Sequence, residues 1–229
     1  MFASVLIVGA GPGLGSSLAR RFSRDGARIA VAARTVEKLR PLEQEIGARA
    51  FACDACDTGA VNRLFDAVSS ALGDPDVVIF NASGRARGLL TDLDPDDVAG
   101  ALAVSAFAGF LVSQAAARRM VPRGRGTILL TGASASVKGF AKSAPFAMGK
   151  FALRGLAQSM ARELSPLGVH VAHVIVDGAI RPPGQLPDPT RPDAMLEPDA
   201  IAETYFQLAS QPRSAWTSEI EVRPWVEHF

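Results

Sequence analysis

Residues 8–22 read VGAGPGLGSSLARRF, a glycine-rich turn between an apolar run and an amphipathic segment. Gly9, Gly13 and Gly15 let the backbone turn tightly, and free N–H groups at the start of the following helix attract phosphate. A strand, then glycines, then a helix predict binding of a dinucleotide through its pyrophosphate, although such a turn can also be a plain connection. A P-loop is excluded because Ser16 follows the last glycine, where that motif has lysine.

Outside this turn, short apolar runs alternate with segments of helical period along the whole chain. The strand-like runs are SVLIV, RIAVAA, ARAFAC, DVVIF, GTILLT and VHVAHVIV, with EIEVRPW as a last edge strand. Strands that are apolar nearly throughout and separated by helices indicate a parallel sheet covered on both faces. Right-handed crossovers make such a sheet doubly wound. We therefore expect an α/β fold, a single Rossmann-type domain over residues 1–229 with about seven parallel strands.

The composition narrows the class of protein. The chain has 229 residues, 48% hydrophobic and 21% charged, which suits one ordered domain of the larger α/β kind. Its net charge of +1 gives no reason to expect nucleic acid or a membrane surface as a partner. The opening MFASVLIVGAG lacks the basic region of a signal peptide, and the apolar stretch ALAVSAFAGFLV, interrupted by Ser105 and Gly109, is too short to span a bilayer. The expected location is the cytoplasm.

Cys53 and Cys56 form a C-x-x-C pair with two interpretations. Such a pair beside a βαβ unit can be a thioredoxin-like redox site. Here Cys53 ends an apolar run and no Trp or Pro frames the pair, so simple packing is favoured. No third or fourth ligand lies nearby, and we expect no metal site.

The end of the second apolar run bears on the type of cofactor. Ala33-Arg34 stands where NAD-binding folds usually carry an acid for the ribose hydroxyls. A guanidinium there can hold the 2′-phosphate of NADP through paired hydrogen bonds. An ordinary solvated arginine is the other interpretation, but the missing acid favours NADP(H), with NAD(H) as the alternative.

Residues 178–196, GAIRPPGQLPDPTRPDAML, interrupt the alternation of strands and helices. A long proline-rich segment after a strand is either a surface insert or a lid over a ligand crevice. We favour a lid, because the crevice of a doubly wound sheet lies at the carboxyl ends of its strands.

Further motifs follow the later strands: IFNASG, GTILLTGASAS, VIVDGAIRPP, and FAMGK at the start of a helix. With the glycine turn, they make the whole chain resemble the short-chain dehydrogenase/reductase family. The resemblance implies a small-molecule carbonyl or alcohol substrate and a homo-oligomer, either a dimer or a tetramer. It also implies a set of cofactor contacts: Gly9, Gly13 and Gly15 at the pyrophosphate, Asp54 at the adenine amine, Asn81 and Ala82 beneath the adenosine ribose, Lys150 at the nicotinamide ribose, and Gly178 and Ile180 at the carboxamide.

The catalytic positions depart from the family pattern. The family's acid is a tyrosine four residues before the lysine, and that position is Phe146. The serine position falls at Ala133, with Ser134 one residue later, and Ser105 stands where an asparagine is expected. Lys150 and Ser134 are therefore the candidate catalytic residues.

These departures leave several functions open. The first is an NADP(H)-dependent oxidoreductase with an altered proton source or a substrate that needs none. The second is an NADP(H)-binding pseudoenzyme that acts as a sensor or partner subunit, and a non-redox enzyme comes third. Other residues near the site could supply a proton, although each also reads as an ordinary loop or helix residue: Lys138, Lys142, Ser143 and Tyr205.

Overall fold

The computed structural model describes residues 2–227 and has a parallel β-sheet at its centre. In that range one sheet of seven strands has the order β3-β2-β1-β4-β5-β6-β7, and all pairs are parallel. The strands are β1 (Ser4–Val8), β2 (Arg28–Ala33), β3 (Arg49–Ala52), β4 (Val77–Phe80), β5 (Gly126–Thr131), β6 (Val169–Val176) and β7 (Glu219–Val222). The predicted parallel sheet is confirmed, with β7 at one edge. The winding direction reverses between β1 and β4, which places the ligand crevice of such a sheet at their carboxyl ends.

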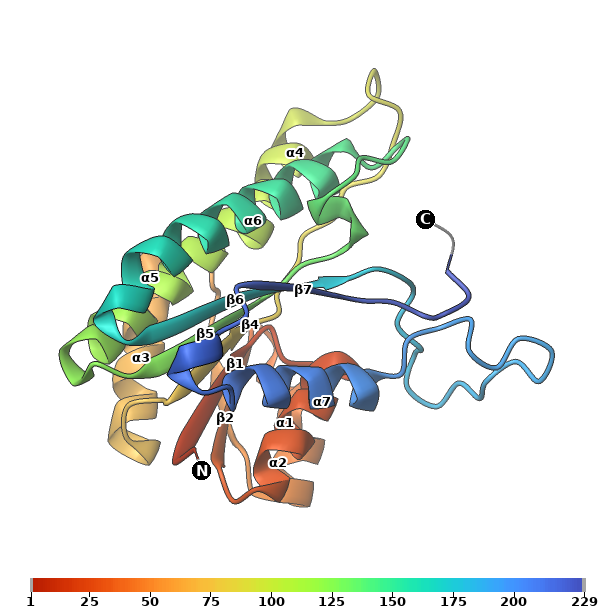
Figure 1. Cartoon of the computed structure of the whole chain (residues 1–229). Coiled ribbons are helices and arrows are strands. Elements are labelled where there is room, and N and C mark those ends of the chain that lie inside the picture. The colour runs from red at the N-terminus through yellow and green to blue at the C-terminus, as the bar shows by residue number, and fades with distance from the viewer. Residues whose placement is uncertain (1, 228–229) are drawn as a thin grey trace.

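Helices cover both faces of the sheet (Figure 1). One face carries α1 (Leu14–Arg24), α2 (Arg40–Ile46) and α7 (Pro198–Ala209). The other carries α3 (Thr58–Leu72), α5 (Ala108–Met120) and α6 (Ala144–Leu164), with α4 (Pro95–Leu102) packed against α6. A π-helical turn, η2 (Ala103–Phe107), joins α4 to α5. Short 3₁₀ turns complete the chain: η1 (Val36–Leu39), η3 (Val121–Arg123), η4 (Ser134–Ser136), η5 (Ser165–Leu167) and η6 (Arg213–Ala215).

Successive side chains of each strand enter two separate cores, as the period of a strand requires. In β1, Ile7 packs toward α1 and α7, whereas Leu6 packs toward α3 and α5. Phe22 and Phe65 are fully buried in the first and second core respectively. Burial of each such side chain contributes about 1.5–3 kcal/mol, so the sheet is fixed from both sides.

The helix that contains Ser105 is longer than the apolar stretch of the sequence suggests. Residues Pro95–Arg123 form a continuous helical run of 29 residues, long and apolar enough by length and composition to cross a bilayer. The expectation that this stretch is too short was therefore wrong, because α4, η2 and α5 join end to end. In the most apolar 18-residue part of this helical run, 44% is buried inside the protein. Val112 and Met120 pack in the second core, and this packing accounts for the apolar composition of the run.

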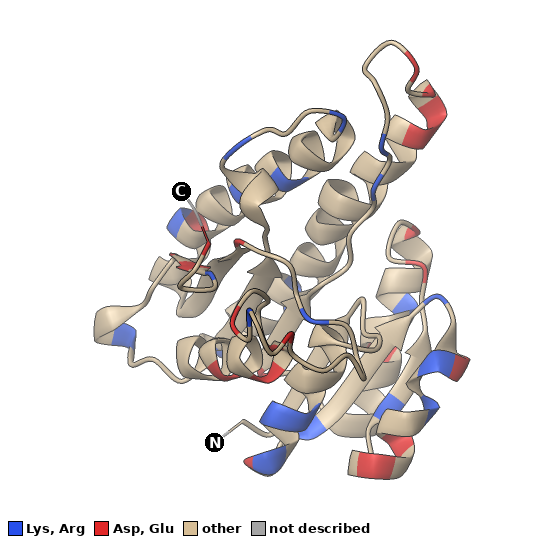
Figure 2. Ribbon diagram, turned by 90° about the vertical axis from the view of Figure 1, so that its right-hand side faces the viewer, with Lys and Arg blue, Asp and Glu red and all other residues tan. Residues whose placement is uncertain are grey.

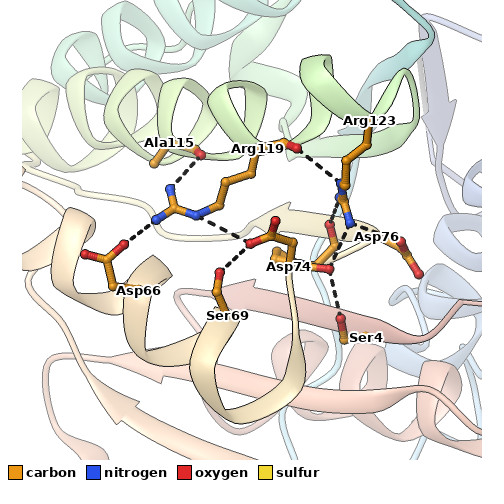
Figure 3. A network of polar contacts seen from close by, with 9 residues as sticks. Ser4, Asp66, Ser69, Asp74, Asp76, Ala115, Arg119 and Arg123 are labelled. Carbon is orange, nitrogen blue, oxygen red and sulfur yellow. Dashed lines mark hydrogen bonds and ion pairs between the residues drawn. The ribbon is translucent and has the colours of Figure 1, made fainter.

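Two arginines fix the amino ends of the central strands (Figure 3). Arg119 of α5 donates to Asp66 Oδ1 of α3 at 2.5 Å. Arg123 donates to the carbonyl oxygens of Asp74 and Pro75, at 3.1 and 2.7 Å, in the turn that enters β4. The contacts hold α5 against α3 at the edge of the sheet opposite the glycine turn. These polar contacts therefore stabilise the sheet at the ends of the strands that lie away from the glycine turn.

The glycine turn passes very close to the end of β4. Gly9 has φ +83°, and a Cβ there would lie 2.4 Å from the Ala82 nitrogen. Only glycine fits this backbone conformation and this contact without movement of the strand end. At Gly11, by contrast, a Cβ would meet nothing within 4 Å.

We predict that Gly9→Ala lowers the free energy of unfolding by about 2 kcal/mol or more, because it adds backbone strain to a steric clash. Gly11→Ala, in the same turn, should change it by less than about 0.5 kcal/mol. Equilibrium unfolding in urea measures both. Equal losses in the two variants would mean that the approach to Ala82 does not restrict this position.

Candidate functional site

The carboxyl ends of β1, β4, β5 and β6 surround a cavity of about 670 Å³. This is within the usual size range of small-molecule sites. Its walls come from residues far apart in the sequence: the glycine turn (residues 9 and 11–15), Asn81 and Ser83 after β4, residues 131–134 at the end of β5, Phe146 and Lys150 of α6, and residues 178–183 after β6. We call it the main cavity.

One end of the main cavity is suited to an anion. The backbone N–H groups of Leu14 and Gly15 in the first turn of α1 have no acceptor among residues 2–227. Arg181 also lines the main cavity, and its buried Nη1 has no hydrogen-bond partner among residues 2–227, although Nη2 pairs with Glu197. Buried donors without an acceptor are costly, and phosphate oxygens would satisfy them.

A second cavity of about 330 Å³ adjoins the first at Gly9, Asn81 and Ser83. Arg34, Asp54 and Ala82 line it, so the two cavities together contain all of the sequence-predicted cofactor residues. The Asn81 amide donates to the Gly9 carbonyl at 3.1 Å, which ties the glycine turn to the end of β4. Arg34 is exposed and has no carboxylate partner in the described part of the chain.

Among the described residues, Lys150 is the only lysine on the wall of the main cavity, and it is 2% exposed. Its Nζ donates to the Thr131 carbonyl at the end of β5, at 2.7 Å. No carboxylate in the described range forms an ion pair with it. Burial, and secondarily the positive charge of Arg85, lower the pKa of Lys150 to about 7. At neutral pH this amine is therefore close to the midpoint of its titration.

Phe146 lies between two cations. Lys150 Nζ is 5.9 Å from the centre of its ring, and the Arg85 guanidinium carbon is 4.4 Å from the same centre. A ring face attracts cations, so Phe146 helps to keep two positive groups in one small volume. It offers neither a proton nor an acceptor to anything in the cavity.

The two candidate serines differ in their surroundings. Ser134 lines the main cavity beside Ala133, and its hydroxyl has no partner within the described range. Ser105 is fully buried away from the cavity wall. Its hydroxyl accepts from the Gly84 N–H at 2.9 Å and donates to the Gly84 carbonyl at 3.2 Å. Ser105 therefore anchors the loop after β4 rather than facing the cavity.

Tyr205 is a poor proton source. It is fully buried on α7, its hydroxyl donates to Thr131 Oγ1 at 2.8 Å, and burial raises its pKa. Of the other proton-source candidates, Lys138 pairs with Asp177 at 3.4 Å. Lys142 and Ser143 do not line the main cavity.

The cysteine pair has the features of packing residues. Both thiols are free, and burial raises the pKa of Cys53 to about 11. A thiol that stays protonated at neutral pH is a weak nucleophile. Among residues 2–227 no group of three or more His, Cys, Asp or Glu could hold a metal ion.

Sequence reasoning missed Arg181, Arg85 and Arg87, all of which line the main cavity. Arg181 directly follows the predicted contact Ile180, and this adjacency was the available signal. Arg85 and Arg87 follow the asparagine motif in NASGRARG, where loop arginines are usually solvated. Only the fold brings them beside Phe146.

Comparison with known proteins gives consistent matches. Residues 3–183 match the model of a family described as short chain dehydrogenase. A D-threitol dehydrogenase of Mycolicibacterium smegmatis is 30% identical over 72% of this chain, and the match spans 66% of that relative. The cyclic-di-GMP-binding biofilm dispersal mediator protein of Escherichia coli is 34% identical over 77% of this chain and 73% of its own length. A metagenomic short-chain oxidoreductase, solved in complex with NADP, is 32% identical, with a TM-score of 0.85 and 97% of each chain covered.

The burial of Lys150 predicts a pH-dependent cost to stability. Its pKa is about 7 in the folded chain and 10.5 without burial, so between about pH 7 and pH 10.5 the unfolded state binds a proton that the folded state does not. The native free energy of unfolding should fall by a few kcal/mol as pH decreases from 10 to 7. Lys150→Met should remove this part of the slope and be more stable at pH 7.

The measurement is urea unfolding at pH 7, 8, 9 and 10, with exposed Lys38→Met as the control. A stability difference between Lys150→Met and the native chain that does not change with pH would contradict the lowered pKa.

Proposed function

Because the chain belongs to the short-chain dehydrogenase family of oxidoreductases, we propose that it is an NADP(H)-dependent oxidoreductase acting on a small carbonyl or alcohol substrate. The observation that carries this proposal is that the glycine turn and Lys150 line one cavity. A phosphate-binding turn and a titratable amine that line one cavity fit the chemistry of a bound nicotinamide cofactor.

The cofactor contacts follow from the positions of the side chains. The amides of Leu14 and Gly15, together with Arg181, would hold the pyrophosphate. Arg34 would hold the 2′-phosphate, with Asp54, Asn81 and Ala82 around the adenosine. Lys150 would contact the nicotinamide ribose, and the backbone of Gly178 and Ile180 the carboxamide. When bound, NADPH supplies a hydride to the carbonyl carbon of the substrate.

Lys150 is our candidate for the proton donor. Phe146 would occupy the position of the family tyrosine, so the phenol is absent. An ammonium whose pKa is about 7 can release a proton at neutral pH, and this one lines the cavity while the Thr131 carbonyl holds it in place. The free Ser134 hydroxyl would bind the substrate oxygen that takes up the proton.

We predict that single-turnover oxidation of NADPH slows as pH rises through about 7, because only the ammonium form of Lys150 can donate. Lys150→Ala should abolish the reaction. Phe146→Tyr should raise the rate about ten-fold or more and extend it to higher pH, because it adds a second acid. Activity that survives in Lys150→Ala would rule out this catalytic centre.

A second prediction concerns the choice of cofactor. The native protein should bind NADPH about ten- to hundred-fold more tightly than NADH, the value of one charge-assisted contact to the 2′-phosphate. Arg34→Ala should remove most of this difference, whereas Arg24→Ala, on an exposed part of α1, should keep it. Fluorescence titration gives both dissociation constants. Equal values for the two cofactors in the native chain would contradict the assignment of Arg34.

The second candidate function is a catalytically inactive NADP(H)-binding protein, a sensor or a partner subunit. Phe146 favours it, since a benzene ring cannot replace a catalytic acid. The relative from Escherichia coli bears a name that states a binding role rather than a reaction. In that case the native and Phe146→Tyr proteins would both bind NADPH, and neither would oxidise it across a broad substrate panel.

We also propose a lid and a homo-oligomer. Two backbone hydrogen bonds join the ends of the segment 178–196. The Leu196 N–H donates to the Ala179 carbonyl at 2.8 Å, and the Arg181 N–H donates to the Leu196 carbonyl at 2.9 Å. The segment between them could close over the main cavity with Arg181 at its base.

The homo-oligomer would use the surface of α5 and α6. Phe110 and Phe151, on these two helices, are 40% and 45% exposed, which suits a contact between copies of the chain.

A further inference from the structure

An outer cavity of about 590 Å³ opens beside the main cavity. It lies between the loop after β4 and residues 140–143, which precede α6. Arg85, Arg87 and Phe146 line both cavities, so the two are continuous at these side chains. The Gly88 N–H donates to the Lys142 carbonyl at 3.2 Å and joins the two walls.

The charge of the outer cavity is entirely positive over the described residues. Arg85, Arg87 and Lys142 line it, and no Asp or Glu does. Neither arginine has a carboxylate within ion-pair distance in the described part of the chain. Partial desolvation, and then repulsion from Arg87, lower the pKa of Arg85. Two like charges held together without a counter-ion cost free energy, which a bound anion would offset.

Some arginines of this chain are neutralised by a carboxylate. Arg154 forms two hydrogen bonds with Glu219, both at 2.7 Å, and Arg20 forms two with Glu45. The loop after β4 has acidic residues of its own, but they lie at its far end beside the start of α4, away from its basic part (Figure 2). No carboxylate of this loop therefore neutralises Arg85 or Arg87.

The backbone around these arginines is held in place. Ser105 binds both the N–H and the carbonyl of Gly84, directly before Arg85. The guanidinium of Arg85 lies over the ring of Phe146, whose other neighbour is Lys150. Lys142 has φ +61°, a left-handed conformation that costs free energy in a residue other than glycine. Such strain is typical of segments that position functional groups.

We propose that the outer cavity binds an anionic group, a carboxylate or a phosphate, of the carbonyl substrate through Arg85 and Arg87, so that the substrates are oxo acids or phosphorylated carbonyl compounds. This inference rests on the proposed function and adds the substrate class to it. Guanidinium groups match the paired oxygens of both anions. Phe146 would pack against the carbon chain between the anion and the carbonyl beside Lys150.

The test is calorimetric binding of matched pairs, with and without NADP⁺. The pairs are 4-oxopentanoate with its methyl ester, and dihydroxyacetone phosphate with dihydroxyacetone. In the native protein at least one anion should bind about ten-fold or more tightly than its neutral partner. Which pair shows the larger ratio distinguishes a carboxylate site from a phosphate site.

The double variant R85Q/R87Q should reduce this ratio to less than about three-fold, and Arg85→Lys should retain part of it. Arg118→Gln, an exposed arginine on α5, should leave it unchanged. Urea unfolding checks that the double variant is folded. Equal binding within both pairs, no binding of any of the four compounds, or a preference that survives in R85Q/R87Q would each overturn the inference.

NADPH oxidation measured in parallel separates this inference from the proposed function. Anion binding that depends on the arginines, without any turnover, would support the anion site and count against an oxidoreductase. Turnover of a neutral carbonyl compound, with no preference for its anionic counterpart, would support the oxidoreductase and overturn the anion site.

Discussion

A lysine amine buried at the carboxyl end of β5, held by a backbone carbonyl and without a carboxylate, determines the chemistry available in the main cavity. An ammonium in such a place loses hydration that one carbonyl does not replace, so its pKa falls toward neutrality. A carboxylate partner would stabilise the charge and raise the pKa again. Burial of Lys150 therefore lowers the stability of the fold, and the same burial gives an amine that can exchange a proton near pH 7.

Other positive groups line the same cavity as Lys150. These groups are Arg181, Arg85 and Arg87, and the ring of Phe146 has both Arg85 and Lys150 beside it. The walls of the main cavity include no Asp or Glu among the described residues. The phosphorylated cofactor and the anionic substrate that we propose would each place negative charge beside these groups.

Much of this arrangement could be predicted from the sequence, because it depends on local patterns. Apolar runs separated by helical segments define seven parallel strands, and all their carboxyl ends meet at one edge. Residues that follow the strands, such as Gly9 and Asn81, therefore had to lie together. Three-dimensional packing decided what local patterns could not. Ser105 faces Gly84 rather than the cavity, since the helix turns it inward at η2. Arg85 and Arg181 belong to loops whose path no local pattern specifies.

The most direct test of the proposed site is a crystal structure of the NADP⁺ complex. We expect the 2′-phosphate beside Arg34 and the nicotinamide ribose within hydrogen-bond distance of Lys150 Nζ. We also expect a pyrophosphate oxygen on the nitrogen of Arg181 that has no partner in the described chain. A dinucleotide bound elsewhere, or one that leaves Lys150 and Arg181 without contact, would contradict the central claim that this cavity is a cofactor site built around a buried lysine.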